Sequence, residues 1–199
     1  MDGVRVDPDA RTVHVQAGVR CGAVVAAAEP HGLASLNGSA PSVDAVSYTL
    51  GGGLGILARE FGYADDHTTR WRSVSYRCDG STAVRSRSTE VRSIRRCVVQ
   101  VNHLGGALAR SAPNAVAYRD GRFLVRVLTV GDREAARSIL DPAFVLLAPD
   151  ALGRLLNFAF GAGDRGDGLY DAETAKRLAG VKSQCDPANL FIRNYGISA

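Results

Sequence analysis

A cluster of glycines near residue 50 limits what this chain can fold into more than any other part of its sequence. Residues 49–55 read Thr-Leu-Gly-Gly-Gly-Leu-Gly, so four glycines fall within five positions. Without Cβ atoms this backbone can reach positive φ, and a flat or anionic ligand can approach its N–H groups. The cluster is not a P-loop, because no Gly-Lys-Ser/Thr follows it, and Ile56 stands where a GxGxxG motif needs its last glycine. A structural turn and a ligand-binding loop both stay open at this point.

The residues before the glycine cluster predict a strand hairpin followed by a helix. Apolar and polar side chains alternate over residues 4–6 and 13–17, on either side of an Asp-Pro turn, as in two half-buried strands. The Ala- and Val-rich residues 21–29 favour a helix, and the Pro and Gly within 30–32 end it. Residues 35–48 are expected to form a long loop that leads into the glycine cluster.

The second half of the chain carries further strand and helix patterns. Alternating apolar residues predict strands over 98–101 and 123–130. Three helices are each expected to begin at an aspartate N-cap, over residues 132–140, 150–160 and 171–184. Between the last two, the four glycines of 161–168 predict a loop.

The positive charge is confined to one segment. Residues 70–96 contain eight Arg against two acidic residues, a local net charge of +6 in a chain whose total is +4. A basic binding module for nucleic acid is one interpretation, but stacking side chains are limited to Trp71 and Tyr76 and no known module is present. We therefore expect no nucleic-acid partner.

Cysteine and histidine spacing gives no metal site. Cys21, Cys78, Cys97 and Cys185 form no CxxC pair and the four His are scattered, so reduced thiols and no metal are predicted. No apolar run approaches the roughly 18 residues of a membrane helix, and the first residues lack the apolar segment of a secretory signal. The expectation is a cytoplasmic protein without a membrane partner.

Three groups of motifs, taken in order, resemble one known family. The first group comprises residues 18–22, 31–33, 38–43 and 49–55, with Arg59, Gly62 and Asp66. The second comprises residues 103–107 and 118–123, and the third residues 177–178, Lys182, 186–187, 189–191 and Asn194. Together they resemble the FAD-linked oxidases, specifically the berberine-bridge-enzyme-like group of the vanillyl-alcohol-oxidase superfamily. The resemblance covers roughly residues 1–67, 98–130 and 170–197.

For Asp186 and Asn189 we prefer roles in the turn and helix end around Pro187 to contacts with a cofactor.

The resemblance implies an α+β fold, a PCMH-type FAD-binding domain of two α/β subdomains, here incomplete and carrying a remnant of the substrate-domain sheet. Residues 1–97 would form the partial FAD-binding domain and residues 98–160 the remnant of the substrate domain. Residues 161–199 would be a C-terminal segment that returns to the FAD-binding domain. Residues 68–97, rich in Arg and Ser, depart from the family pattern, which favours a frame-shifted or degenerate insert.

The cofactor implied by the resemblance is FAD. The residues expected along it are Ser39, Ser42, Thr49, Gly51, Gly52, Gly53, Gly55 and Asn194. Family members often link the flavin to a His that this chain does not contain, and Ala40 stands where some relatives form a cysteinyl bond, so non-covalent binding is predicted. Asp44 replaces a family glycine and would repel a pyrophosphate that it faced.

The activity implied by the resemblance is hydride transfer from an alcohol or similar C–H donor to flavin, with O2 as acceptor. The substrate would be a small molecule such as an alcohol, a sugar or an alkaloid-like compound. No catalytic residue is assigned, because Tyr118 and Tyr170, the tyrosines of the matched segments, fit packing roles better. The alternative is a truncated, inactive family remnant with weak or no FAD binding. Some relatives are exported, whereas this chain is expected in the cytoplasm.

Overall fold

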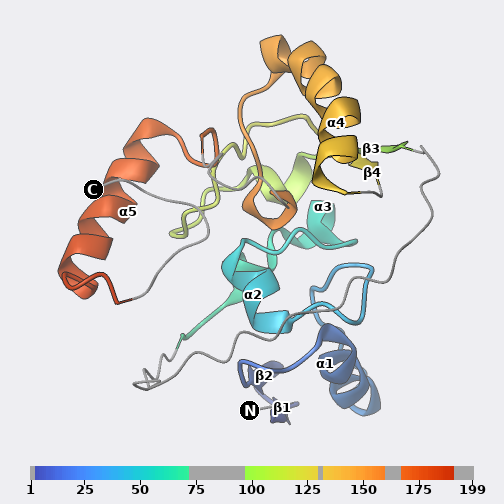
Figure 1. The fold of residues 1–199 in the computed structure, drawn as a ribbon. Coiled ribbons are helices and arrows are strands. Elements are labelled where there is room, and N and C mark those ends of the chain that lie inside the picture. The colour runs from blue at the N-terminus through green and yellow to red at the C-terminus, as the bar shows by residue number, and fades with distance from the viewer. Residues whose placement is uncertain (1–2, 72–96, 130–131, 160–166, 191–199) are drawn as a thin grey trace. The chain divides into compact units, whose positions relative to one another are not determined.

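The computed structural model describes residues 3–71, 97–129, 132–159 and 167–190. Its strands are β1 (Val4–Asp7), β2 (Thr12–Val15), β3 (Cys97–His103) and β4 (Phe123–Thr129). Its α-helices are α1 (Cys21–Ala28), α2 (Ala45–Leu50), α3 (Ala58–Phe61), α4 (Arg133–Leu147) and α5 (Ala172–Cys185). Its 3-10 helices are η1 (Glu29–His31), η2 (Ala64–His67), η3 (Gly106–Ala109), η4 (Ala148–Asp150) and η5 (Leu156–Phe158). Figure 1 colours these elements in chain order, and their mixture agrees with the predicted α+β class.

The N-terminal hairpin and the helix that follows it are confirmed. β1 and β2 pair antiparallel, with Val4 opposite Val15. α1 packs against both strands and buries three of its side chains. The helix ends as the sequence indicates, because Pro30 stands in the short turn η1 and Gly32 follows with a left-handed φ of 64°.

The loop predicted over residues 35–48 is wrong in its last part, because α2 begins at Ala45. Asp44 caps this helix, and its carboxylate accepts a hydrogen bond from the Ser47 N–H at 2.7 Å. The Asp-x-x-Ser pattern was the available signal, but six residues are too few to show helical periodicity. Asp44 therefore has a structural role at the start of α2.

The helix predicted over residues 150–160 is also wrong. Asp150 ends the turn η4, residues 151–155 have no regular secondary structure, and only the single turn η5 follows within the described part of this stretch. Gly153, which weakens helix propensity, packs directly against the Tyr118 ring. Asn157, within η5, hydrogen-bonds to residues more than 100 positions earlier in the chain. These distant contacts override a local preference for helix.

The remaining elements follow the sequence pattern more closely. Strands β3 and β4 form, as predicted, and pair as a two-stranded sheet. Asp132 caps α4 by accepting from the Ala135 N–H, although the helix runs to Leu147 through Pro142, beyond its predicted end. Asp171 caps α5 in the same way. No helix of the described residues has the length and apolar character needed to cross a membrane.

The chain divides into two compact units. The first contains Met1–His67, Asn102–Leu124 and Ala151–Ala199, and the second contains Thr68–Val101 and Val125–Asp150. A buried cluster in the first unit consists of Ala58, Tyr63 and Leu108, with Leu54, Leu104, Val116 and Leu155 packed against it. This division reflects packing alone, so the functional domain boundaries at residues 97 and 160 stay predictions.

Candidate functional site

The glycine loop, residues 51–55, lies in the first unit between α2 and α3. The first three N–H groups of the loop already have protein acceptors. Gly51 donates to the Ser47 carbonyl at 3.2 Å and Gly52 donates to the Thr49 carbonyl at 2.8 Å. Gly53 donates to the Asn157 side chain at 2.9 Å. These three amides serve the fold of the protein itself.

Protein atoms also occupy the space that the missing Cβ atoms leave free. A Cβ at Gly53, where φ is +77°, would lie 2.6 Å from the Ala64 Cβ and 2.9 Å from the Tyr48 ring. A Cβ at Gly55 would lie 2.8 Å from the Asn37 carbonyl oxygen. The loop therefore needs glycine at these positions whether or not a ligand is bound. The close approach at Gly55 also sets the glycine loop directly beside Asn37, two residues before Ser39.

Tyr48 lies at the centre of this arrangement. Its ring packs close to Gly38 and Gly53, and its hydroxyl would be 3.2 Å from a Cβ on Gly55. The hydroxyl is buried and makes no hydrogen bond within the described residues. Burial, together with the nearby Cys21 thiol, raises the pKa of Tyr48 above its usual range. Tyr48 thus acts as a neutral spacer between the two predicted cofactor segments.

Asn157 was missed by the sequence analysis. Its Oδ1 accepts from the Gly53 N–H and its Nδ2 donates to the Tyr48 carbonyl, both at 2.9 Å. The available signal was a lone amide inside an apolar run, since Asn157 stands between Leu156 and Phe158. A polar side chain in such a run needs a hydrogen-bond partner if it is buried, but sequence does not say which one.

The predicted site residues outside the glycine loop divide into three cases. Ser39 and Ser42 are exposed, and their hydroxyl and N–H groups donate to no acceptor among the described residues. The Thr49 hydroxyl donates a hydrogen bond to the Ala45 carbonyl within α2, at 2.8 Å. Asn194 lies outside the described residues. No finding tests the role of any of these residues, so all of them stay predictions.

The end of the Ser39–Ser42 segment is tied to the start of α1. The Cys21 N–H donates to the Val43 carbonyl at 2.8 Å, and the Gly22 N–H donates to the Pro41 carbonyl at 2.9 Å. Arg20 adds a hydrogen bond from its guanidinium to the Ser42 carbonyl at 3.0 Å. This segment is held by backbone groups, so its exposed hydroxyls stand on a fixed support.

An ion pair joins two of the three motif groups used above. Arg119 donates to Asp66 through both terminal nitrogens, at 2.6 and 3.2 Å, and both side chains are largely buried. Asn114 and the Tyr63 N–H also donate to Asp66. Burial alone would raise the pKa of Asp66, but these hydrogen bonds and the Arg119 charge outweigh it and hold the pKa below its usual value.

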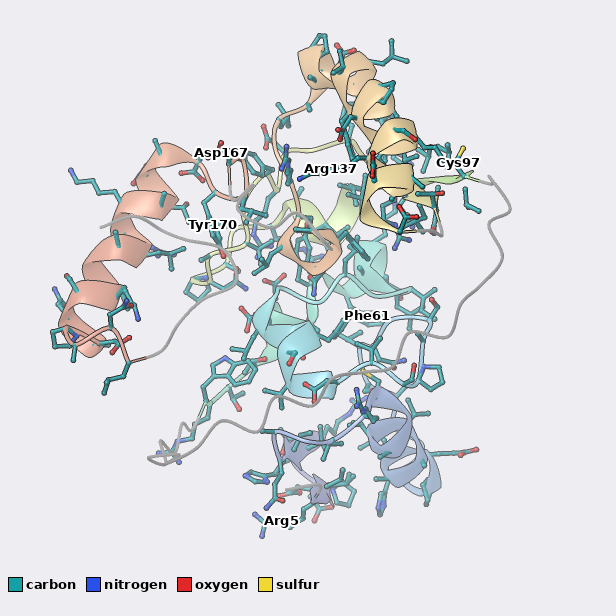
Figure 2. The ribbon with its side chains drawn as sticks, in the orientation of Figure 1. Arg5, Phe61, Cys97, Arg137, Asp167 and Tyr170 are labelled. Atoms are coloured by element: carbon teal, nitrogen blue, oxygen red, sulfur yellow. The ribbon has the colours of Figure 1, made fainter. Side chains whose placement is uncertain are left out.

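The ion pair involves Asp66 of η2, and η2 in turn contacts the glycine loop. The Ala64 and Asp65 N–H groups donate to the Gly53 and Gly52 carbonyls, each at 3.0 Å. Phe61, labelled in Figure 2, ends α3 just before the chain turns toward η2. The glycine loop is therefore supported by η2 on one side and by Asn157 on the other.

The described tyrosines include no candidate for a base at neutral pH. Burial raises the pKa of Tyr63, Tyr118 and Tyr170, as it does for Tyr48. Tyr170, which precedes α5 in Figure 2, is half-buried, and Tyr118 packs on Gly153. Within the described ranges, no three His, Cys, Asp or Glu side chains converge on a possible metal position, and Cys21, Cys97 and Cys185 are free thiols.

The described residues fit a flat, anionic cofactor along one part of the predicted site. Ser39 and Ser42 offer exposed donors, and the Leu54 and Gly55 N–H groups have no acceptor within the described ranges. Backbone N–H groups and hydroxyls of this kind can hold phosphate oxygens without a lysine. The N–H groups of Gly51, Gly52 and Gly53 do not fit such a role while their present hydrogen bonds last.

Comparison with known proteins identifies the first part of the chain. Residues 1–84 match the model of the FAD binding domain. The chain is also similar to berberine bridge enzyme-like D-1 of Nicotiana tabacum, with 39% identity over 71 residues, which are 34% of this chain and 12% of the tobacco protein. The match thus spans about an eighth of that relative's length. No solved structure matches the chain.

Proposed function

We propose, on the premise that residues 1–84 belong to the FAD-binding domain family of the berberine-bridge-enzyme-like FAD-linked oxidases, that this chain binds FAD non-covalently as part of an oxidoreductase. One observation carries the proposal. The glycine loop lies directly beside Asn37, at the start of the segment that carries Ser39 and Ser42, with a Gly55 Cβ position 2.8 Å from the Asn37 carbonyl oxygen. Both segments present N–H groups that have no protein acceptor within the described residues.

The chemistry would follow from the cofactor. When bound, FAD accepts a hydride from a substrate C–H bond, and we propose an alcohol, a sugar or an alkaloid-like small molecule as donor and O2 as the final acceptor. The residues of this chain would bind and orient. The Ser39 and Ser42 hydroxyls would donate to phosphate oxygens, and the Leu54 and Gly55 amides would face the flat part of the cofactor. The division of the domain into two α/β subdomains belongs to the same proposal.

A second candidate is a family member that binds FAD weakly or not at all and catalyses nothing. The observation in its favour is that the Gly51, Gly52 and Gly53 amides are already bonded within the protein. An incoming cofactor would have to use other donors or displace these bonds.

A cytoplasmic location and the absence of nucleic-acid and membrane partners also stay proposals.

The visible absorption spectrum of the purified chain, taken before and after denaturation, separates the two candidates. Flavin bands that leave with the small-molecule fraction on denaturation would support non-covalent FAD binding. A colourless protein that takes up no added FAD would refute the proposal and support the inactive remnant.

Substitution of the exposed serines tests the site itself. The double variant Ser39→Ala/Ser42→Ala should raise the Kd for FAD roughly tenfold, because two hydrogen bonds to an anionic group are lost. Ser138→Ala, an exposed serine of α4 whose hydroxyl donates to the Ala135 carbonyl, is the matched control and should leave the Kd unchanged. Equal Kd values for both variants would contradict the assignment of Ser39 and Ser42.

A further inference from the structure

We propose that Asn157 is a positioning residue that fixes the glycine loop in the conformation that receives the cofactor; the link to the cofactor rests on the function proposed above. The side chain bridges two backbone groups that are close in sequence to each other and far from Asn157 itself. Gly53 and Tyr48 precede it by 104 and 109 residues. The match to the FAD binding domain model ends at residue 84, so residues 151–159 contribute to the proposed site from outside the matched region.

Among the residues that the structure describes, neither backbone group has another partner. The Tyr48 carbonyl belongs to the last turn of α2, where the helix itself supplies no N–H group to bond a carbonyl oxygen. The neighbouring Ser47 and Thr49 carbonyls accept from Gly51 and Gly52, whereas the Tyr48 carbonyl accepts from Asn157. Asn157 therefore caps the C-terminus of α2 and holds the start of the glycine loop with the same amide.

The interaction requires an amide at position 157. One atom has to accept a hydrogen bond from Gly53 and the other has to donate one to Tyr48, and a carboxylate or an apolar side chain cannot do both. The loop leaves room for this amide, since a Cβ at Gly51 would lie 2.6 Å from the Asn157 Nδ2. We infer that glycine is needed at position 51 because of Asn157 and not because of a ligand.

Asn157 also affects the Leu54 and Gly55 N–H groups, which are the two loop amides open to a ligand. Gly53 has a φ of +77°, and its N–H is held by Asn157 while its carbonyl accepts from Ala64. With Gly53 fixed on both sides, the direction of the next N–H groups, those of Leu54 and Gly55, is set as well. Asn157 thus acts on the cofactor site through Gly53, without touching a ligand.

Leu155 provides the control for a merely structural effect. It lies two residues before Asn157 and packs against the buried cluster around Tyr63 and Leu108. Leu155→Ala should therefore lower the stability of the same unit without removing a hydrogen bond from the glycine loop. Asn157→Ala removes both hydrogen bonds, and Asn157→Asp keeps an acceptor for Gly53 but loses the donor to Tyr48.

The test measures the Kd for FAD by flavin fluorescence and the exchange rate of the Gly53 amide by NMR, on the full chain. We expect both Asn157 variants to raise the Kd at least about tenfold, and Asn157→Ala to speed exchange at Gly53 by a similar factor. Leu155→Ala should lower Tm while its Kd stays within about twofold of the unmodified chain.

Two results would overturn the inference. If Asn157→Ala binds FAD as tightly as the unmodified chain, or more tightly, the side chain does not position the cofactor site. If the exchange rate of the Gly53 amide is unchanged in Asn157→Ala, the Asn157 side chain does not hold the Gly53 N–H. The exchange measurement needs no FAD, so a chain that binds no FAD would refute the proposed function while still testing the role of Asn157.

Discussion

Truncation of Arg119 should destabilise the protein far more than truncation of a neighbouring arginine. The Arg119 guanidinium makes two hydrogen bonds to Asp66 and others to Asn114 and to the Leu108 and Arg110 carbonyls. Its side chain and that of Asp66 are only 13% and 14% exposed. Removing one partner of a buried pair costs about 3–5 kcal/mol, and the residual exposure places Arg119→Ala near 3 kcal/mol. For a chain of this size that lowers Tm by roughly 6–12 °C.

Chemical and thermal denaturation would measure this loss, with Arg122→Ala as the matched control. Arg122 is exposed, and its guanidinium lies 5.8 Å from the centre of the Phe123 ring, so its truncation should cost less than about 1 kcal/mol. A double-mutant cycle between Asp66→Ala and Arg119→Ala should give a coupling energy of about 2 kcal/mol. If Arg119→Ala does not fold, Arg119→Lys keeps the charge without the forked geometry and should lose about 1–2 kcal/mol. The reasoning is refuted if the coupling energy is near zero or if the Arg119 and Arg122 variants are equally stable.

Three further changes test other contacts. Tyr48→Phe should leave the protein as stable or raise its unfolding free energy by about 1 kcal/mol, because the hydroxyl is buried without a partner; a clear loss in urea denaturation would show that the hydroxyl has one. Because the pKa of Asp66 is lowered in the folded protein, its ionised form adds stability that is complete above the unfolded pKa near 4 and is lost as pH falls through the folded pKa. In acid titration, Asp66→Asn should therefore lose less stability than the unmodified chain. The exposed Asp171, whose pKa is also lowered, should still contribute to the loss in both proteins. Gly53→Ala should cost more than Gly32→Ala by at least about 1 kcal/mol, since both have positive φ but a Cβ at Gly32 would meet nothing within 4 Å; equal Tm values would contradict the packing around Gly53.

Local signals were sufficient for elements that end or begin at a single decisive residue. The turn that contains Pro8, the stop at Gly32 and the N-cap at Asp171 each act within four residues, and all three lie where the sequence predicts them. The preferred reading of Asp186 is also supported, because its carboxylate accepts from the Leu190 N–H in the turn after α5. In such cases short-range hydrogen bonding fixes the backbone before distant contacts matter.

Elements that depend on distant partners could not be predicted in this way. Residues 150–160 read as a helix, yet Tyr118 and the glycine loop hold residues 153 and 157 in another conformation. In the candidate site, the sequence predicted positive φ, which Gly52 and Gly53 adopt, and left open whether protein atoms or a ligand fill the room beside the loop. It could not show that Asn157 and Ala64 fill that room, because neither residue has a local pattern that names its partner.

The separation between Asn157 and its partners also bears on how the protein folds. A hydrogen bond between residues 104 positions apart closes a long loop of chain, and the entropy of that closure must be overcome before the contact forms. Contacts of this kind slow folding relative to local ones, so the hairpin and α1 can form well before the glycine loop is fixed. During synthesis, the loop emerges from the ribosome long before Asn157 does. The proposed cofactor site is consequently among the last parts of the first unit to mature, and a nascent chain stalled before residue 157 would carry the glycine loop without its final shape.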